Sequence, residues 1–311
     1  MKIFSIAFLT FFILNNSFGQ KIEKIYLNKN DSTANRYLTV SPEQTPYKGY
    51  MFLIPSFYES PENVMGQTDL PILAAEKGIM TIIPTFKTGL GSFGIDSLTQ
   101  LSFKEIIEDV NIRYNLENLK FYIGGFSIGG SCVVKFAEDA VKDNYQYQPD
   151  GIFVVDPPLD FVRFYNSNKR TLRIAPNSKL SKEANYMALR IEIEMDGTPN
   201  TNLQNYIKKS PYSFTDTSQT AIKQIRNTPI RYYSEPEINW KMKEYGNSDF
   251  SDLNGLDGSC MINELVLLGN TNAQLILTED KGYRKPNNRK KPHSWSIIDD
   301  QELIQWLQSL Q

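Results

Sequence analysis

One short segment has the residue types and the spacing of a nucleophile site. Gly125, Ser127 and Gly129 form a Gly-x-Ser-x-Gly pattern between an expected strand at Leu119–Ile123 and an expected helix at Ser127–Lys142. At such a junction the serine hydroxyl is exposed, and glycines on either side avoid collisions that Cβ atoms would cause. The start of a helix also places partial positive charge where an oxyanion would form. We predict that Ser127 is a nucleophile; a strand–helix turn that merely needs small residues is the alternative.

A serine hydroxyl is a poor nucleophile unless a base removes its proton. The sequence contains a single histidine, His293. It follows the last expected strand, Ala273–Thr278, and precedes a closing helix near Ile297–Leu310. A lone histidine is often a surface or capping residue, but its place after Ser127 and at the end of the last strand favours the role of general base.

An acid that orients the imidazole is expected between Ser127 and His293 along the chain, after the strand expected at Pro229–Tyr233. Glu235 and Glu237 both lie in that loop. We predict Glu237, because it lies four residues beyond the strand and can reach back to the imidazole, whereas Glu235 is expected to turn outward. Solvated loop glutamates are the alternative for both. The other candidate acids are Asp160, Asp249 and Asp252, of which the first follows the preceding core strand.

An oxyanion hole needs two backbone N–H donors. One is expected from Ile128, the residue after the nucleophile. The other is expected in the segment that follows the apolar strand Gly49–Pro55. We predict Phe57 for this donor, and Tyr58 is the alternative.

The elements that must position these residues alternate between strands and helices, which predicts an α/β fold with a mostly parallel sheet and helices on both faces. The interval from about 161 to 226 breaks this alternation, and a structureless loop of that length is uncommon. We therefore predict one domain over residues 20–311 with a cap inserted at about 161–226. The other expected strands are Ile22–Leu27 and Arg36–Val40, which form a hairpin, Ile79–Pro84 and Asp150–Val155; the other expected helices are near Leu70–Lys77, Phe103–Tyr114, Lys182–Glu194 and Met261–Leu268.

The amino terminus has the pattern of an export signal. Lys2 is followed by an apolar run, Ile3–Leu14, and by small residues at Ser17 and Gly19. We predict a signal peptide at residues 1–19 and a secreted or periplasmic mature protein. A membrane anchor is the alternative, but the run is shorter than the about 20 residues that span a bilayer.

Composition excludes several classes of function. The chain has 311 residues, 41% hydrophobic and 22% charged, which is typical of a globular protein. A net charge of -2 argues against a nucleic-acid partner. One histidine and two cysteines, Cys132 and Cys260, exclude multi-histidine and thiolate metal sites, and we predict no metal and no cofactor. Outside the cytoplasm the two cysteines could pair or remain two separate buried thiols.

Two charged segments allow more than one interpretation. Six basic residues between Lys281 and Lys291 could attract an anionic substrate, although a solvated loop has the same composition. The acidic stretch Asp249–Asp257 could bind calcium, but its spacing fails the EF-hand pattern and favours a capped helix start.

Taken together, the segment Ile54–Pro61, the Ser127 motif, the acid loop at Glu235–Glu237 and the terminal His293 resemble the α/β-hydrolase superfamily over residues 21–311. The resemblance implies an eight-stranded, mostly parallel sheet, a Ser–acid–His triad and hydrolysis through an acyl-enzyme. The chain departs from the family in having Pro55-Ser56 where His-Gly is usual, and in a glutamate where aspartate is more frequent.

The function that follows is a secreted serine hydrolase that cleaves small-molecule or glycan-linked esters and has no membrane span. A serine peptidase or amidase on the same triad is one alternative. A binding protein that keeps the fold without turnover is another, because a fold does not fix a function.

Overall fold

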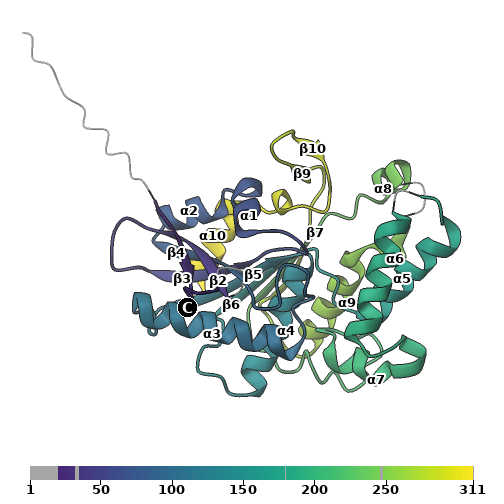
Figure 1. Cartoon of the computed structure of the whole chain (residues 1–311), viewed down its shortest axis with the longest axis horizontal. Helices are drawn as coiled ribbons and strands as arrows, with labels where there is room; N and C mark the ends of the chain where they lie inside the picture. Colours follow the sequence, from purple (N-terminus) through teal and green to yellow (C-terminus); the bar gives the residue numbers. More distant parts are fainter. Residues whose placement is uncertain (1–19, 32–34, 179, 246–247, 311) are drawn as a thin grey trace, which may run out of the picture.

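The computed structural model describes residues 20–31, 35–178, 180–245 and 248–310. Most of the strands form a single sheet at the centre of the molecule (Figure 1). The predicted signal peptide, residues 1–19, lies outside the described residues. The strands of the sheet are β1 Lys21–Tyr26, β2 Arg36–Ser41, β3 Gly49–Ile54, β4 Ile79–Thr85, β5 Lys120–Phe126, β6 Gly151–Val155, β7 Ile230–Ser234 and β8 Ala273–Leu277.

The sheet has eight strands in the order β1-β2-β4-β3-β5-β6-β7-β8. β2 runs antiparallel to both of its neighbours, β1 and β4, and every later neighbouring pair is parallel. The predicted eight-stranded, mostly parallel sheet and the opening hairpin are therefore confirmed. Because β3 and β5 to β8 are parallel, their carboxyl ends meet at one edge of the sheet, and loops that follow different strands can assemble one site there.

The apolar runs of the sequence form the centre of the sheet because helices cover both faces. The strands β3 and β4 are buried at every residue, as the continuous apolar runs predict. On one face lie α3 Ser97–Tyr114, α4 Ile128–Lys142 and α9 Asn254–Leu267. On the other lie α1 Pro61–Gln67, α2 Leu70–Glu76 and α10 Asp300–Ser309 (Figure 1).

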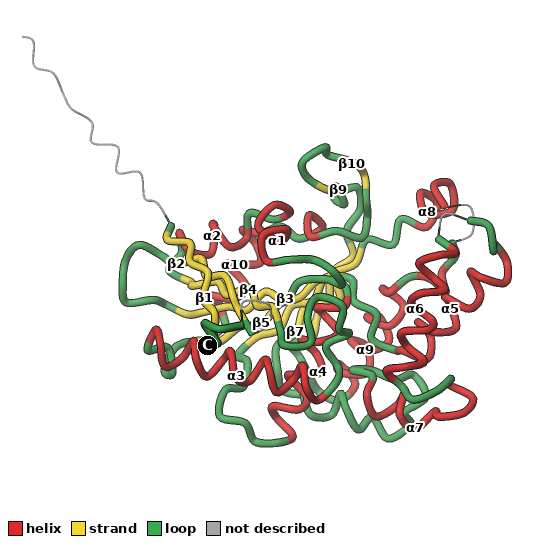
Figure 2. Tube along the Cα trace, in the orientation of Figure 1, coloured by secondary structure: helices red, strands yellow, loops and turns green. Residues whose placement is uncertain are grey.

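The chain between β6 and β7 forms three helices, where the sequence predicted only one helical segment, at Lys182–Glu194. They are α5 Phe161–Ile174, α6 Ser181–Glu194 and α7 Pro199–Lys209. These helices lie together to one side of the sheet (Figure 2). Their apolar side chains form a third hydrophobic cluster, which includes Ile128 at the start of α4. The inserted segment is therefore packed directly against the residue that follows Ser127.

Two further segments lie near the carboxyl edge of the sheet. The helix α8 Ile238–Tyr245 follows β7, and a short hairpin of β9 Tyr283–Arg284 and β10 Arg289–Lys290 follows β8 (Figure 1). Short 3-10 turns occur at Phe250–Asp252 and Trp295–Ile297. The hairpin and the second turn flank His293 in the sequence, so they determine where the imidazole lies.

Candidate active site

Ser127 occupies the sharp turn between β5 and α4. Its backbone angles are φ 53° and ψ −126°, an uncommon conformation for a residue other than glycine. Two of the glycines are required by close backbone approach: a Cβ atom on Gly125 would lie 2.4 Å from the carbonyl oxygen of Gly129, and one on Gly129 would lie 2.3 Å from that of Ile54. The turn predicted from the Gly-x-Ser-x-Gly pattern is therefore confirmed as a structure, with Ser127 partly exposed at its tip.

The two predicted oxyanion donors lie on either side of the same turn. Ile128 is the first residue of α4, so its N–H has no acceptor within the helix. On the β3 loop, the Tyr58 N–H donates to the carbonyl oxygen of Leu90 at 2.8 Å, which removes Tyr58 as the alternative donor. No acceptor for the Phe57 N–H is found among the residues that the structure describes. Phe57 and Ile128 line one cavity with Ser127, and their roles as donors remain a prediction.

The histidine is held by a carboxylate. Nδ1 of His293 lies 2.8 Å from Oδ2 of Asp156, the residue that follows β6 directly. The second carboxylate oxygen accepts a hydrogen bond from Ser234 Oγ at 2.7 Å, at the end of β7. The imidazole also packs against Phe126, with 4.7 Å between ring centroids. With one ring nitrogen held by Asp156, the other is left to face a substrate or Ser127.

The prediction that Glu237 orients the imidazole does not agree with the structure. Oε1 of Glu237 accepts from Lys290 Nζ at 2.9 Å and from the Asp280 N–H at 3.2 Å. Glu237 lines a different cavity from the one that contains Ser127 and His293. The carboxylate instead comes from the loop after β6, one strand earlier than expected. Sequence reasoning placed a candidate, Asp160, in that loop but missed Asp156.

The other candidate acids have structural roles. Asp160 is the N-cap of α5 and accepts from the backbone N–H groups of Val162 and Arg163. Asp249 and Asp252 cap the 3-10 turn at Phe250–Asp252, which confirms the capped start predicted for this stretch.

Glu235 is fully buried and faces inward, contrary to the outward orientation expected for it. It accepts from the N–H groups of Lys281 and Gly282, both at 2.9 Å. It therefore holds the start of the loop that leads to His293.

The pKa values of the two partners favour an ionised acid beside a neutral imidazole. Burial, together with the positive charges of Lys241 and Arg284, keeps the pKa of His293 below its ordinary value of 6.5, although Asp156 acts in the opposite direction. Burial acts to raise the pKa of Asp156, but the hydrogen bond and charge of His293 outweigh it and keep that pKa below its ordinary value. A neutral imidazole beside a carboxylate is the protonation state that general-base chemistry requires.

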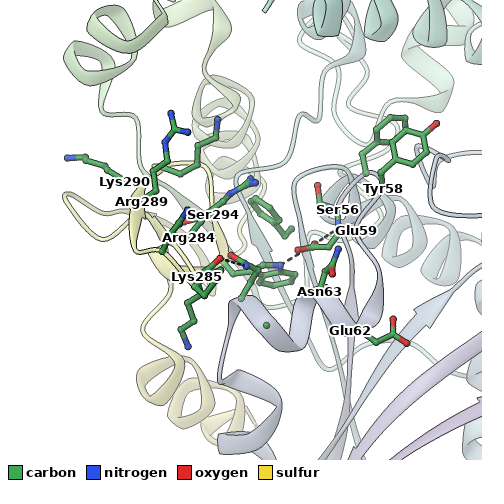
Figure 3. Close-up of a pocket in the computed structure, with 18 of the residues that line it drawn as sticks. Ser56, Tyr58, Glu59, Glu62, Asn63, Arg284, Lys285, Arg289, Lys290 and Ser294 are labelled. Carbon is green, nitrogen blue, oxygen red and sulfur yellow. Dashed lines mark hydrogen bonds between the residues drawn. The ribbon is translucent and has the colours of Figure 1, made fainter. Parts of the chain in front are cut away.

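Two cavities meet at the site. The inner cavity, of about 420 Å³, is lined by Ser127, Ile128, Asp156 and His293 and by residues of α5, α6 and α8. The outer cavity, of about 1000 Å³, lies between the β9–β10 hairpin, α8 and α1. Figure 3 shows the hairpin's basic side chains on one side of it and the loop after β3 on the other. The residues that line both cavities are Ser56, Phe57, Trp240, Tyr245, Arg284 and Lys291.

Three further properties concern the described residues alone. Cys132 and Cys260 are free thiols, so of the two alternatives the structure has them unpaired. No cluster of three or more metal-binding side chains occurs in the part of the chain that the structure describes. None of its helices, over the same residues, is both long and apolar enough to cross a bilayer.

No protein-family model matches the sequence, and none of the curated proteins does. The fold is similar to several solved structures. An acylaminoacyl peptidase from Pyrococcus horikoshii is 13% identical with a TM-score of 0.57, over 94% of this chain and 42% of that one. An S-formylglutathione hydrolase from Agrobacterium tumefaciens is 12% identical with a TM-score of 0.52, over 96% and 98%. The fluorophosphonate-binding serine hydrolase F of Staphylococcus aureus is 15% identical with a TM-score of 0.50, over 93% and 98%.

Proposed function

The chain has the α/β-hydrolase fold, and on this premise we propose that it is a serine hydrolase that cleaves carboxylic esters through a covalent acyl-enzyme. One observation carries the proposal: His293 is hydrogen-bonded to Asp156 at 2.8 Å, and both line one cavity with Ser127 at a strained strand–helix turn. The solved structures with this fold include proteins described as an esterase, peptidases and hydrolases, which supports hydrolytic chemistry as the class.

The proposed reaction has two halves at one site. In the first, Ser127 Oγ attacks the ester carbonyl while Nε2 of His293 takes its proton, and Asp156 stabilises the imidazolium that forms. The N–H groups of Phe57 and Ile128 stabilise the oxyanion, and the start of α4 adds partial positive charge. His293 then returns the proton to the departing alcohol. In the second half, His293 activates a water molecule that releases the acid from Ser127.

An ester and an amide with the same acyl group test both the class and the bond. We expect the chain to hydrolyse 4-nitrophenyl butyrate faster than butyryl 4-nitroanilide, because an alcohol leaves more readily than an amine. The matched control is Ser127→Ala, which removes only the hydroxyl. If neither compound is turned over above this control, the hydrolase proposal fails. If the anilide is cleaved at least as fast as the ester, the chain is an amidase or peptidase.

We also propose that the protein is exported and acts on small-molecule or glycan-linked esters. The charged start and apolar run of residues 1–14 support export. Expression of the full chain in a bacterium with separation of cell fractions tests this. Mass spectrometry of the secreted or periplasmic protein is expected to show an amino terminus at Gln20. A cytoplasmic product that still begins at Met1 or Lys2 would contradict the proposal.

A further inference from the structure

The basic segment before His293 contains two kinds of cation. Three of its side chains are paired with carboxylates on neighbouring elements: Lys285 with Asp69 at 2.8 Å, Arg289 with Glu244 at 3.1 Å, and Lys290 with Glu237 at 2.9 Å. These pairs fix the hairpin to its surroundings and leave little charge for a ligand. The cations that can still bind an anionic ligand are those without such a pair.

Arg284 and Lys291 are the unpaired cations nearest the site. Arg284 donates to the carbonyl oxygen of His293 at 3.2 Å, and Lys291 donates to the hydroxyl of Tyr245. Neither of these acceptors carries a negative charge, and although the charge of Arg284 acts to lower the pKa of Glu59, the two side chains do not form an ion pair. Both cations line the inner and the outer cavity, so they lie where the two meet. Their positive charge is therefore available at the entrance to the Ser127 site.

A third cation, Lys241, also lines the inner cavity, and it lies on α8, whereas Arg284 and Lys291 belong to the segment before His293. Over residues 20–31, 35–178, 180–245 and 248–310, none of these three cations has a carboxylate within ion-pair distance. Lys241 is half-buried. Burial lowers its pKa, the negative charge of Asp156 acts to raise it, and the positive charge of Lys291 acts to lower it, so the ammonium groups of Lys241 and Lys291 repel each other.

The acids that line the inner cavity are hydrogen-bonded to other groups or exposed to solvent, and none forms an ion pair with the three cations in the part of the chain that the structure describes. Asp156 is held by His293 and Ser234, and Asp252 accepts from the backbone N–H of Asp249. Glu183 lies exposed in the first turn of α6. Mutually repelling cations beside a cavity are destabilising unless a ligand supplies the opposite charge.

We propose that the ester substrate carries an anionic group, which Lys241, Arg284 and Lys291 bind where the inner and outer cavities meet. The anion is a carboxylate, sulfate or phosphate, the groups for which guanidinium and ammonium are the usual partners. Phe57, Trp240 and Tyr245 line the same region and provide aromatic surface for the carbon skeleton. The inference rests on the proposed hydrolase function, since it assigns a substrate class to that site.

Pairs of esters with the same scissile bond and a similar carbon skeleton, one charged and one neutral, test this inference. With the anion on the acyl side, the pair is the mono-4-nitrophenyl ester of glutaric acid and 4-nitrophenyl valerate. With the anion on the leaving group, it is 4-acetoxybenzoic acid and its methyl ester. For each pair we compare the ratio of kcat/KM for the charged ester to that for the neutral ester between the wild type and the variants. This comparison cancels the intrinsic reactivity of the two esters, which is the same for every variant.

We expect Lys241→Gln, Arg284→Gln and Lys291→Gln each to lower this ratio about fivefold in at least one pair. We expect the wild-type ratio to fall between about 20 mM and about 500 mM NaCl, because salt screens the attraction. The control is Lys77→Gln, an exposed cation at the end of α2, two residues before β4 begins at the opposite edge of the sheet. It removes the same charge and is expected to leave the ratio unchanged.

The outcomes separate the inference from the function on which it rests. If the neutral esters are hydrolysed but the ratios are the same in all variants and at both salt concentrations, the anion-binding inference is wrong and the hydrolase function stands. If no ester in either pair is hydrolysed above the Ser127→Ala control, the function itself fails. If the ratio falls equally in Lys77→Gln, the preference for the charged ester depends on the overall charge of the protein and not on the three cations at the site, and the inference is also wrong.

Discussion

Asp156 is fixed from several directions, which is what an orienting acid needs. Besides His293 and Ser234, which its carboxylate contacts, its backbone N–H donates to the carbonyl oxygen of Tyr233 at 2.8 Å. Asn254 donates to its backbone carbonyl at 2.9 Å. The residue has a φ of 49°, which an aspartate tolerates better than most side chains. These contacts hold the carboxylate so that the imidazole keeps one tautomer and one orientation.

Replacing the Asp156 carboxylate tests directly whether Asp156, and not Glu237, is the acid that orients His293. We expect Asp156→Asn to lower kcat/KM for a 4-nitrophenyl ester by about 10³- to 10⁴-fold, because an amide cannot stabilise the imidazolium. Glu237→Gln, the matched change at the acid expected from the sequence, is predicted to stay within about threefold of the wild type, since its partner is Lys290. If circular dichroism shows that both variants are folded and Glu237→Gln loses more activity than Asp156→Asn, then Glu237 is the acid that orients His293.

The pH dependence follows from the same geometry. His293 acts as a base only when neutral, so kcat/KM is expected to rise with pH and to level off above the pKa of its imidazolium. Because burial and nearby cations lower that pKa, the midpoint should lie below 6.5. Removing one cation with Lys241→Met should move the midpoint upward, while Lys77→Met should not. A wild-type midpoint above 6.5, or a downward shift in Lys241→Met, would contradict this account.

The local geometry that the sequence predicted correctly is the strand–helix turn, which is defined by the spacing of neighbouring residues. Ser127 and its glycines lie within five consecutive residues, and their geometry depends on one turn. The partner of His293 depends on how the loops after β6 and β7 lie side by side, and the sequence around each loop does not contain that information. One signal was present: Asp156 follows an apolar strand directly and precedes Pro157-Pro158, a place where a short fixed loop is expected.

At the scale of elements, the elbow between β5 and α4 is set by close backbone contacts with β3. A Cβ atom on Gly129 would lie 2.3 and 2.4 Å from the carbonyl oxygens of Ile54 and Pro55. The Ile54 carbonyl cannot move aside cheaply, because Ile54 is the last residue of β3 and is paired with Gly125 of β5. The glycine therefore sets the distance between the elbow and the loop that contains Phe57, the proposed second oxyanion donor.

Alanine substitutions at two glycines test this constraint. We expect Gly129→Ala to lower the free energy of unfolding by about 2 kcal/mol and to reduce activity, because the added methyl displaces β3 or α4. The matched control is Gly66→Ala in α1, where a Cβ atom would meet nothing within 4 Å. There the free energy of unfolding should stay the same or rise by up to about 1 kcal/mol, as for glycine replaced in a helix. Equal losses in both variants by urea denaturation would disprove the contact argument.

The elements that the sequence missed have weak local signals. The central strands, such as β3 and β4, were predicted because their apolar runs are continuous and buried. In contrast, α5 and α7 are rich in Asn, Ser, Thr and Lys, several of which have modest helix propensity. Their helices are stabilised by packing between α5, α6 and α7, which is a tertiary effect. The two-residue strands β9 and β10 are too short to produce a periodic pattern.

At the scale of the whole molecule, the inserted helices and the sheet domain share one hydrophobic cluster. It joins Ile191 of α6 and Tyr206 of α7 to Phe93 and to Ile128, the proposed oxyanion donor. Of the inserted helices, α5 and α6 also line the inner cavity with Ser127. The insertion thus forms part of the wall of the site and also supports the residue next to the nucleophile.

Substitutions of two isoleucines on α6 test whether the inserted helices support the site. Ile191 is fully buried in the cluster, whereas Ile193 has 72% of its surface exposed. We expect Ile191→Ala to lower the free energy of unfolding by about 3 kcal/mol and to reduce kcat/KM, because it leaves a cavity beside Ile128. Ile193→Ala should change stability by less than about 0.5 kcal/mol and leave the kinetics unaltered. If Ile191→Ala loses stability but keeps full activity, the inserted helices do not support the site.

The central claim is that His293, held by Asp156, activates Ser127. The most direct test is mass spectrometry of the intact protein and of its proteolytic peptides, after the folded protein, residues 20–311, has reacted with a fluorophosphonate probe that labels activated serines. We predict a single adduct on the peptide that contains Ser127, absent from Ser127→Ala and formed much more slowly in His293→Ala. A folded wild-type protein that forms no adduct, or an adduct that persists in Ser127→Ala, would contradict the account.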